Sequence, residues 1–227
     1  MEHTGRKEDQ VKKVFSAINN KYDLIDSLIS FGLDQHWRSL LINGMGIREG
    51  STVIDCGAGT GKLTETLGKR CPTCSIISVD ITVEMYRKPK NANARFLLAS
   101  AESIPLPDNS ADYIMSSYLT RNLSDVSRYF REAFRLLRSG GTIGNLDIYN
   151  PTAPGFSQLF GAYFYHLVPF VGNSLTGSKA YSYLAKSVLN FYSPGRVSEL
   201  LKEAGFVSVR MKPMMLGAIV LHWGMKP

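Results

Sequence analysis

Val53-Ile54-Asp55-Cys56-Gly57-Ala58-Gly59-Thr60-Gly61 is the stretch of this 227-residue sequence that decides its fold. In it an apolar run ends in an acid and three alternating glycines, and residues 62–67, which have the composition of a helix, follow directly. Glycines adopt positive φ angles and let a ligand approach the backbone closely. The N–H groups at the start of a helix would face such a ligand. The pattern therefore predicts a strand that leads into a loop able to hold a nucleotide-like ligand.

The spacing of these glycines indicates which ligand the loop holds. Dinucleotide-binding loops have the spacing G-x-G-x-x-G without an acid two residues ahead, whereas this loop is G-x-G-x-G preceded by Asp55. A carboxylate there disfavours a pyrophosphate and suits the cationic S-adenosylmethionine. The loop residues that we expect to bind this cofactor are Asp55, Gly57, Ala58, Gly59, Thr60 and Gly61.

Further cofactor contacts are predicted at the ends of the following strands. Asp80 ends an apolar run, where an acid can accept hydrogen bonds from both ribose hydroxyls. Ile81 and Met85 are placed to enclose an adenine, although core packing is the alternative for both. The carboxyl ends of successive strands meet at the crevice where open α/β sheets bind ligands. The residues expected there are Asp80, Ile81, Met85, Ser100, Ala101, Glu102 and Ser117.

Apolar strands alternate with helices along the chain. A helix over 125–138 has a continuous apolar face, from Val126 to Leu137. This alternation predicts an α/β fold, a Rossmann-like seven-stranded mostly parallel sheet with helices on both faces, in which the last two strands form an antiparallel hairpin around Pro213. The strands are expected near 52–56, 75–79, 95–98, 112–116, 142–147, 207–211 and 217–223.

The chain is predicted to form a single domain, 1–227, with four parts. Residues 1–50 form an N-terminal helical cap, in which a helical, amphipathic pattern continues from Leu24 to Ile42. Residues 51–149 form the cofactor-binding core, and residues 194–227 a C-terminal helix and hairpin. Residues 150–193 are a helical insertion with ten aromatic side chains. An insertion of this length is usually functional, and the alternative is a helical pair that only caps the core.

The charge and hydropathy of the chain bear on its surroundings. The net charge is +7, and residues 151–227 contribute +5 of it, from seven Lys and Arg against two Glu. A nucleic acid or an anionic membrane surface would explain this excess, and so would an ordinary solvated surface. No apolar run approaches the roughly 18 residues of a membrane span, and residues 1–10 do not resemble a signal peptide. We therefore expect a cytoplasmic protein, with peripheral contact to a membrane left open.

The three cysteines are too few for a disulfide framework. Cys71-Pro-Thr-Cys74 has the spacing of a redox motif, but it lies between the end of a helix and the next strand rather than at a helix start. We therefore favour a structural role over a redox or metal-binding one, expect no metal, and leave open whether these two cysteines pair.

Three segments resemble the Rossmann-like, class I S-adenosylmethionine-dependent methyltransferases. They are 53–61, the stretch Ile104-Pro-Leu-Pro-Asp-Asn-Ser-Ala-Asp112 and the stretch Leu137-Arg-Ser-Gly-Gly141, which has Ser139 where the superfamily usually has proline. Because this last difference affects a turn, it leaves the expected cofactor site unchanged.

A narrower resemblance, to the UbiE-type C-methyltransferases of menaquinone and ubiquinone synthesis, covers nearly the whole chain. Its marks are Val14-Phe15 with Lys21-Tyr-Asp-Leu24, Arg121-Asn-Leu123, Tyr181-Ser-Tyr-Leu-Ala-Lys-Ser187 and Gly217-Ala-Ile-Val-Leu-His222. The chain departs from that family at Leu119-Thr120, where the family has Gly-Leu, and at Tyr192-Ser-Pro-Gly195, which replaces His-Pro-Asp-Gln. These departures concern the shape of the acceptor pocket.

The UbiE resemblance implies methyl transfer to a ring carbon of a prenylated quinol similar to demethylmenaquinol. It implies catalytic roles for Arg121, which would stabilise a phenolate or orient a water acting as base, for Asn122, which would hold a ring oxygen, and for Tyr22, which would close the site. Tyr181 and Tyr183 would line the entrance. The alternatives are a surface salt bridge for Arg121 and ordinary packing for the tyrosines. The partner implied is a lipid quinol or another small molecule, and a homodimer is left open.

Three rival functions remain on sequence grounds. An RNA methyltransferase would share the cofactor loop, but the chain has no appended RNA-binding module and no Asn-Pro-Pro-Tyr-type signature of base flipping. A second rival is a protein that binds the cofactor without turnover. The third is a methyltransferase for another lipid or small phenol, including O-methylation.

Overall fold

A seven-stranded sheet is the centre of the computed structural model, which describes residues 2–18, 22–89 and 92–227. The strand order is β3-β2-β1-β4-β5-β7-β6, and β1 to β5 are parallel while β7 and β6 run antiparallel. The predicted fold class is confirmed. The strands are β1 (Thr52–Cys56), β2 (Ser75–Asp80), β3 (Ala94–Leu98), β4 (Ala111–Ser117), β5 (Leu137–Ile148), β6 (Val207–Met214) and β7 (Ile219–Met225).

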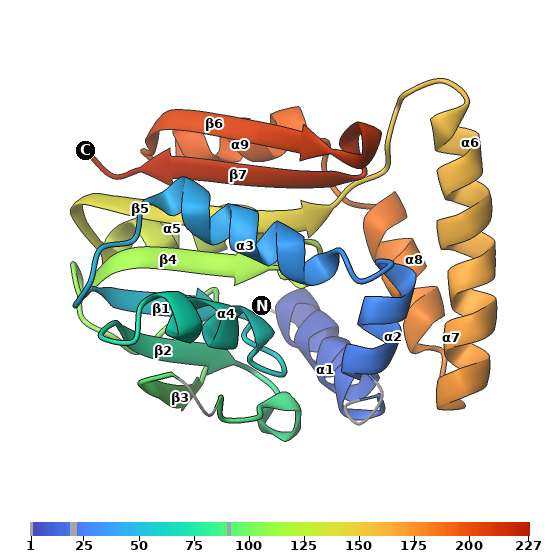
Figure 1. Cartoon of the computed structure of the whole chain (residues 1–227), viewed down its shortest axis with the longest axis horizontal. Helices are drawn as coiled ribbons and strands as arrows, with labels where there is room; N and C mark the ends of the chain where they lie inside the picture. Colours follow the sequence, from blue (N-terminus) through green and yellow to red (C-terminus); the bar gives the residue numbers. More distant parts are fainter. Residues whose placement is uncertain (1, 19–21, 90–91) are drawn as a thin grey trace.

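The helices form two layers and a cluster at one end of the sheet. In Figure 1, α3 and α4 lie in front of the sheet and α5 and α9 behind it, while α1, α2, α6, α7 and α8 gather beyond the carboxyl ends of the strands. The α-helices are α1 (Glu2–Ser16), α2 (Tyr22–Ile29), α3 (Asp34–Met45), α4 (Lys62–Arg70), α5 (Val126–Leu136), α6 (Phe156–Gly161), α7 (Val168–Thr176), α8 (Ala180–Leu189) and α9 (Pro194–Glu203). The shorter turns are η1 (Val83–Met85), η2 (Thr120–Asn122), η3 (Ala162–Leu167) and η4 (Met215–Gly217).

Two apolar cores lie on opposite faces of the sheet. Successive strand residues point to opposite faces, so Val53 joins the core under α3 and α4, and Ile54 joins the core under α5 and α9. Tyr129 and Phe130 of α5 are fully buried in the second of these cores, as the apolar face predicted for this helix requires. Both faces of β1 are covered, which explains why its sequence is a continuous apolar run rather than an alternating one.

A third core joins the N-terminal helices to the insertion. Ile18 and Ile25 pack there with Phe164, Val168 and Tyr181. Segments more than a hundred residues apart in the sequence thus bury each other's apolar faces, beyond the carboxyl ends of the strands.

The pattern from Leu24 to Ile42 is divided between two helices, where the sequence predicted continuity. Helix α2 ends at Ile29, and Phe31 and Gly32 follow with φ angles of 53° and 73° before α3 begins. Backbone in this left-handed region ends a helix. The amphipathic period continues on both sides of the break, which is why periodicity did not reveal it.

The C-terminal hairpin also differs in detail from the prediction. Pro213 lies inside β6, and the turn to β7 falls at η4 (Met215–Gly217). Because β6 is the edge strand of the sheet, a residue without an N–H group is tolerated there.

The insertion contains one long helix and a second, shorter one. Segments α6, η3 and α7 follow one another without a break from Phe156 to Thr176, and η3 is a π-helical turn. Such turns occur often at functional sites. Across the described ranges 2–18, 22–89 and 92–227, no helix combines the length and the hydropathy that crossing a bilayer would need.

Cys71 and Cys74 form a disulfide in the turn between α4 and β2. Both cysteines are buried in the core under α3 and α4. This location, between a helix end and a strand start, agrees with the structural role that the sequence favoured.

Candidate functional site

The loop that follows β1 is held against the end of β2. The N–H groups of Gly57 and Ala58 donate to the carbonyl of Val79 at 2.8 and 3.0 Å. Gly57 has a φ of 67°, and a Cβ atom there would lie 2.7 Å from Leu119 Cδ1. Gly59 also has a positive φ, but a Cβ there would meet no atom within 4 Å. The loop therefore presents bare backbone at Gly59 to open space, as a close-fitting ligand requires.

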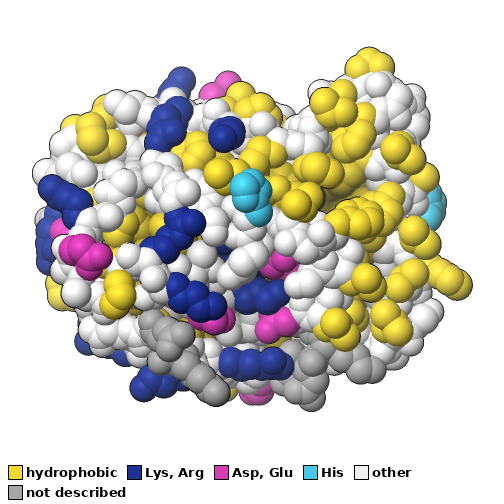
Figure 2. All heavy atoms as spheres, viewed as in Figure 1, with side chains coloured by type: hydrophobic (Ala, Val, Ile, Leu, Met, Phe, Trp, Pro, Cys, Tyr) yellow, Lys and Arg dark blue, Asp and Glu magenta, His cyan; other side chains and the backbone are white. Residues whose placement is uncertain are grey.

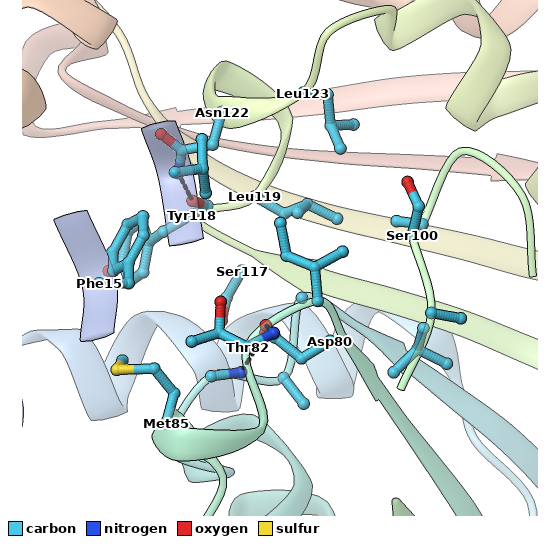
Figure 3. A pocket seen from close by; sticks show the side chains of 18 of the residues that line it. Phe15, Asp80, Thr82, Met85, Ser100, Ser117, Tyr118, Leu119, Asn122 and Leu123 are labelled. Carbon is cyan, nitrogen blue, oxygen red and sulfur yellow. Dashed lines mark hydrogen bonds between the residues drawn. The ribbon is translucent and has the colours of Figure 1, made fainter. Parts of the chain in front are cut away.

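A pocket lies in front of this loop, at the carboxyl ends of β1, β2, β3 and β4 (Figure 3). The structure brings most of the predicted cofactor residues together around it. Those that line the pocket are Gly57, Ala58, Gly59, Thr60, Asp80, Ile81, Met85, Ser100, Ala101, Glu102 and Ser117. Asp55 and Gly61 do not line it.

Asp55 lies behind the loop rather than in the pocket. Its side chain is buried, and its Oδ2 accepts a hydrogen bond from Thr64 Oγ1 of α4 at 2.6 Å. Thr64 Oγ1 also lies 2.9 Å from Ser78 Oγ of β2. Burial raises the pKa of Asp55 to about 7, although the hydrogen bond from Thr64 lowers it. Asp55 thus joins β1 to α4 beneath the cofactor loop.

Asp80 occupies the position predicted for a ribose ligand. Its Oδ2 accepts from the N–H of Gly59 and its Oδ1 from the N–H of Thr82, both at 2.8 Å. Burial raises the pKa of this carboxyl group. Asp80 thus orders the loop and also lines the pocket, where an acid can accept from a ribose hydroxyl. The bare backbone at Gly59 and this acid together fit S-adenosylmethionine.

Helix α1 closes one side of the cofactor pocket, which the sequence did not predict. Glu8, Val11 and Phe15 line the pocket, and Ser100 Oγ donates to Glu8 Oε1 at 2.7 Å. Figure 3 shows Phe15 beside the pocket, on the same side of it as Met85. The helical period of this segment predicted only that it would pack somewhere.

Two basic side chains, Arg38 and Lys62, also line the pocket. Arg38 is buried and forms ion pairs with Asp34 and with Asp26, the latter at 3.3 Å. Lys62 Nζ lies 3.4 Å from Asp34 and 3.7 Å from Asp23. These cations suit a carboxylate such as that of a methionyl group. No local motif marks them, because α3 and α4 bring them together from separate segments.

A second, smaller pocket adjoins the cofactor pocket. Phe15 and Asn122 line both pockets, so the two are contiguous. The second pocket brings Arg121 and Asn122 of η2 together with Tyr181 and Tyr183 of α8. The sequence grouped these four residues only through the family resemblance. Tyr22, the remaining predicted catalytic residue, begins α2, but its side chain lies outside the described residues.

Arg121 forms a buried ion pair with Asp147 of β5. Both side chains are almost fully buried, so the alternative of a surface salt bridge is wrong. Asp147 Oδ2 also accepts from Thr120 Oγ1 at 2.6 Å and from the N–H of Arg121 at 3.2 Å. The Arg121 guanidinium lies 5.5 Å from the ring centre of Tyr118. Asp147 is thus a positioning residue that the sequence did not single out.

Several buried polar atoms of the second pocket lack an acceptor or donor. Asn122 Oδ1 and the hydroxyls of Tyr181 and Tyr183 have no hydrogen-bond partner within the described part of the chain. Burial raises the pKa of both tyrosines, so they remain protonated. A buried polar atom without a partner costs about 1–3 kcal/mol. A ligand with oxygen substituents would satisfy these groups.

Neither His166 nor His222 lines the cofactor pocket or the second pocket. His222 lies on β7, beside β5, and its buried Nε2 is 3.0 Å from the carbonyl oxygen of Pro194 at the start of α9. Burial lowers the pKa of His222 to about 4. His166 is exposed on the insertion.

An apolar groove continues from the second pocket toward the surface. Asp26, Ile29 and Ile148 line both. The groove runs between α2 and the long helix of the insertion. Its other lining side chains are nearly all apolar and include Phe31, Trp37, Phe156, Leu159, Phe160 and Phe164. The cofactor pocket, the second pocket and the groove therefore form one continuous series.

This fold, with an acid-and-glycine loop and an acid at the end of β2, defines a class I S-adenosylmethionine-dependent methyltransferase. Solved structures agree. An S-adenosylmethionine-dependent methyltransferase of Thermotoga maritima, described as a possible histamine N-methyltransferase, superposes with a TM-score of 0.69 at 19% identity, over 95% of this chain and 99% of that one. One from Aquifex aeolicus gives 0.63 at 19% identity, over 90% and 98%. At such identities they establish the fold.

The chain belongs to the ubiE/COQ5 methyltransferase family, whose sequence profile matches residues 3–226. It is 32% identical to the ubiquinone/menaquinone biosynthesis C-methyltransferase UbiE of Salmonella paratyphi B, over 97% of this chain and 92% of that protein. The same identity and coverage hold for UbiE of Salmonella newport. The protein is therefore an S-adenosylmethionine-dependent methyltransferase.

Replacement of Asp80 tests the cofactor pocket. We expect Asp80→Ala to weaken S-adenosylmethionine binding by about 1.5–3 kcal/mol for each hydrogen bond lost to the carboxylate, measured by calorimetry. Asp108→Ala, which removes an exposed acid paired with Arg135, is the control and should bind normally. Unchanged affinity in Asp80→Ala would remove Asp80 from the site, and tight binding of NAD by the wild type would overturn the interpretation of the loop.

Proposed function

We propose that the protein transfers the methyl group of S-adenosylmethionine to a ring carbon of a prenylated quinol similar to demethylmenaquinol. The observation that carries this proposal is the continuous series of hollows: a cofactor pocket, a pocket with buried polar groups, and an apolar groove. A hydroquinone ring with an isoprenoid tail has the same order of polar and apolar parts. The UbiE relatives are C-methyltransferases of ubiquinone and menaquinone biosynthesis, which supports the same substrate class.

The cofactor site in this proposal consists of the loop backbone from Gly57 to Thr60 and the carboxylate of Asp80. S-adenosylmethionine, when bound, supplies an electrophilic methyl group on a sulfonium. Arg38 and Lys62 would attract its carboxylate, and Met85 would contact its adenine. These residues hold and orient the cofactor, while the residues that line the second pocket act on the acceptor.

Arg121 acts on the acceptor through its fixed charge. The buried ion pair with Asp147 holds the guanidinium beside the second pocket, where it stabilises negative charge on a ring oxygen. Preorganised charge of this kind acts strongly because it needs no rearrangement during the reaction. Asn122, at the junction of the two pockets, orients the same ring. Tyr22 remains a catalytic prediction from the resemblance.

The apolar groove is the proposed site of the isoprenoid tail. Its walls include helix α2 and one face of the insertion, from which four of the ten aromatics, Phe156, Phe160, Tyr163 and Phe164, line the groove. A tail in this groove places the ring at the polar pocket beside the methyl donor. The same apolar walls argue against RNA as the acceptor, because phosphates and ribose would find few partners there.

The surface around the mouth of the groove fits a membrane. Leu24 and Leu28 of α2, Phe31 in the turn that follows it, and Leu159 and Phe170 of the insertion are each more than half exposed. Figure 2 shows hydrophobic side chains gathered on the side of the molecule that carries α2, α6 and α7. We propose that this apolar surface rests on the bilayer that holds the quinol, since large exposed apolar patches mark interaction sites.

The basic residues of the last third contribute less to this contact than the sequence suggested. Arg196 pairs with Glu199 and Glu203 on α9. Arg210 stacks on Trp223, and Lys226 donates to backbone carbonyls. Exposed lysines include Lys12 and Lys13 of α1, Lys186 of α8 and Lys179, which directly precedes α8. The proposed contact is therefore mainly apolar, with a smaller attraction to anionic lipid.

Substitution of Arg121 tests the catalytic site. Arg121→Lys keeps a cation opposite Asp147 but loses the planar fork, so we expect kcat to fall by about 10²-fold with little change in S-adenosylmethionine affinity. Arg121→Ala should lower kcat further. It should also cost about 3–5 kcal/mol of stability, because Asp147 is left buried and unpaired, so unfolding is measured in parallel. A folded Ala variant with near-normal kcat would contradict the role.

Substrates of increasing tail length test the groove. Each buried methylene is worth about 0.8 kcal/mol, so KM should fall as the tail lengthens until the groove is full. Leu159→Asp, at the groove, should raise KM for long tails only, whereas Leu189→Asp, equally apolar but away from the groove, should not. Equal kcat/KM for tailless and long-tailed quinols, or methylation of RNA alone, would show that the proposal is wrong.

Vesicle binding tests the membrane contact. We expect the wild type to cosediment with anionic vesicles and to be released partly by salt, because salt screens only the charged component. The double variant Leu28→Glu, Phe170→Glu should lose binding. Val207→Glu, which alters an exposed apolar residue of β6, should retain it. Equal sedimentation of the double variant and the wild type would assign the contact to another surface.

A further inference from the structure

Asp26 is an acid that lines the acceptor pocket, and its pairing with Arg38 of the cofactor pocket accounts for only one of its two oxygens. It lies on α2 at the point where the second pocket opens into the apolar groove, and it lines both. Its side chain is 14% exposed. Arg121, Asn122, Tyr181 and Tyr183 line the same pocket. A hydroxyl of a ring held there would thus meet a carboxylate as well as the four residues of the family motifs.

The two oxygens of Asp26 have different environments. Oδ2 accepts from Arg38 Nη2 at 3.3 Å, and Arg38 is itself held by Asp34 on the same helix, α3. Within the described part of the chain, Oδ1 accepts no hydrogen bond. The carboxylate is therefore anchored through one oxygen while the other is available to a ligand.

We propose that Asp26 is the catalytic proton acceptor, which removes the proton from the ring hydroxyl of the bound quinol during methyl transfer. This assignment rests on the proposed function and deepens it. It gives Arg121 a single role, the stabilisation of the resulting oxyanion, and replaces the alternative in which Arg121 orients a water acting as base.

The proposed step balances in atoms and charge. The hydroxyl proton moves to Asp26 Oδ1, and the electrons of the O–H bond pass into the ring. The ring carbon next to the oxygen-bearing carbon then forms a bond to the methyl carbon, and the pair of the broken C–S bond leaves with sulfur. That ring carbon loses its hydrogen as a proton, the carbonyl oxygen regains one, and the aromatic quinol is restored. Asp26 releases its proton to solvent, so the net products are the methylated quinol, S-adenosylhomocysteine and one proton.

Other titratable groups near this ring are poorly placed to take the proton. Tyr181 and Tyr183 stay protonated because burial raises their pKa. Asp147 is fully buried and bound by Arg121 and Thr120. The histidines lie outside the pocket.

Burial and the charges that face Asp26 determine the direction in which its pKa is shifted. Burial raises the pKa, Arg38 and Lys62 lower it, and Asp34 raises it. The balance leaves it above the usual range of a carboxyl group. Below its pKa Asp26 is protonated and inactive as a base, so kcat should rise with pH through this pKa and level off above it. A base whose pKa lies nearer the working pH is the more effective one.

The pH dependence of kcat in Asp26→Asn is the first test. We expect a loss of about 10²- to 10⁴-fold at neutral pH, with normal S-adenosylmethionine affinity. The plateau should disappear, so that the rate climbs until the quinol itself ionises, near pH 10 for a phenol. Asp108→Asn is the control, since Asp108 is an exposed acid that pairs with Arg135 and lines none of these pockets. It should retain the wild-type pH profile.

Binding of an unreactive ligand is the second test and needs no turnover. Prenylated 1-naphthol and prenylated naphthalene differ by one hydroxyl. In the wild-type complex with S-adenosylhomocysteine, that hydroxyl should improve affinity by about 10- to 100-fold, as for a hydrogen bond to a charged group. In Asp26→Asn the gain should fall below about tenfold.

The outcomes separate the two proposals. A wild-type pH profile in Asp26→Asn, with an undiminished hydroxyl gain, would overturn the role of Asp26 and leave quinol methylation standing. If the wild type methylates no quinol and shows no hydroxyl gain, both proposals fail. If Asp26→Asn loses activity only because it unfolds, binding to the folded fraction still tests the role of Asp26. A purely structural Asp26 would leave unchanged the improvement in affinity that the hydroxyl of the naphthol provides.

Discussion

The parallel alignment of β1 with its two neighbours is the constraint on which the rest of the structure depends. β1 pairs with β2 on one side and β4 on the other, so the ends of all three strands reach the same edge of the sheet. N–H groups of the loop after β1 can then donate hydrogen bonds to the carbonyl of Val79 at the end of β2. Asp80, one residue further, holds Gly59. The cofactor pocket thus depends first on the register of the strands and only then on particular side chains.

Buried charge is the second feature that shapes the site. Arg121 with Asp147 and Arg38 with Asp34 and Asp26 are ion pairs almost out of solvent. Such pairs gain little net stability, because desolvation offsets the Coulomb attraction. Their value lies in geometry, since each holds a guanidinium at a pocket wall. The two clusters meet around Tyr118, whose ring lies 5.1 and 5.5 Å from the two guanidinium groups.

The acceptor site is built from both ends of the chain. Helices α1 and α2 could not bury their apolar faces alone, and neither could the insertion, so they pack together into a third core. The tail groove and the polar pocket are what this packing leaves unfilled. Substrate recognition therefore depends on an interface between segments separated by more than a hundred residues, whereas cofactor recognition depends on adjacent strands.

Local sequence determined the fold class, the strands, helix α5 and most of the cofactor residues, because hydrophobic period and glycine spacing are local properties. Tertiary structure alone decided the rest. It moved Asp55 behind the loop, since only the packing of α4 supplies Thr64, and it broke the helix at Phe31, where the period gave no signal. It also brought Arg38 and Asp26 to the pockets and Asp147 against Arg121. Their charges are visible in the sequence, but their partners come from distant segments, and an electrostatic environment exists only once those segments have packed together.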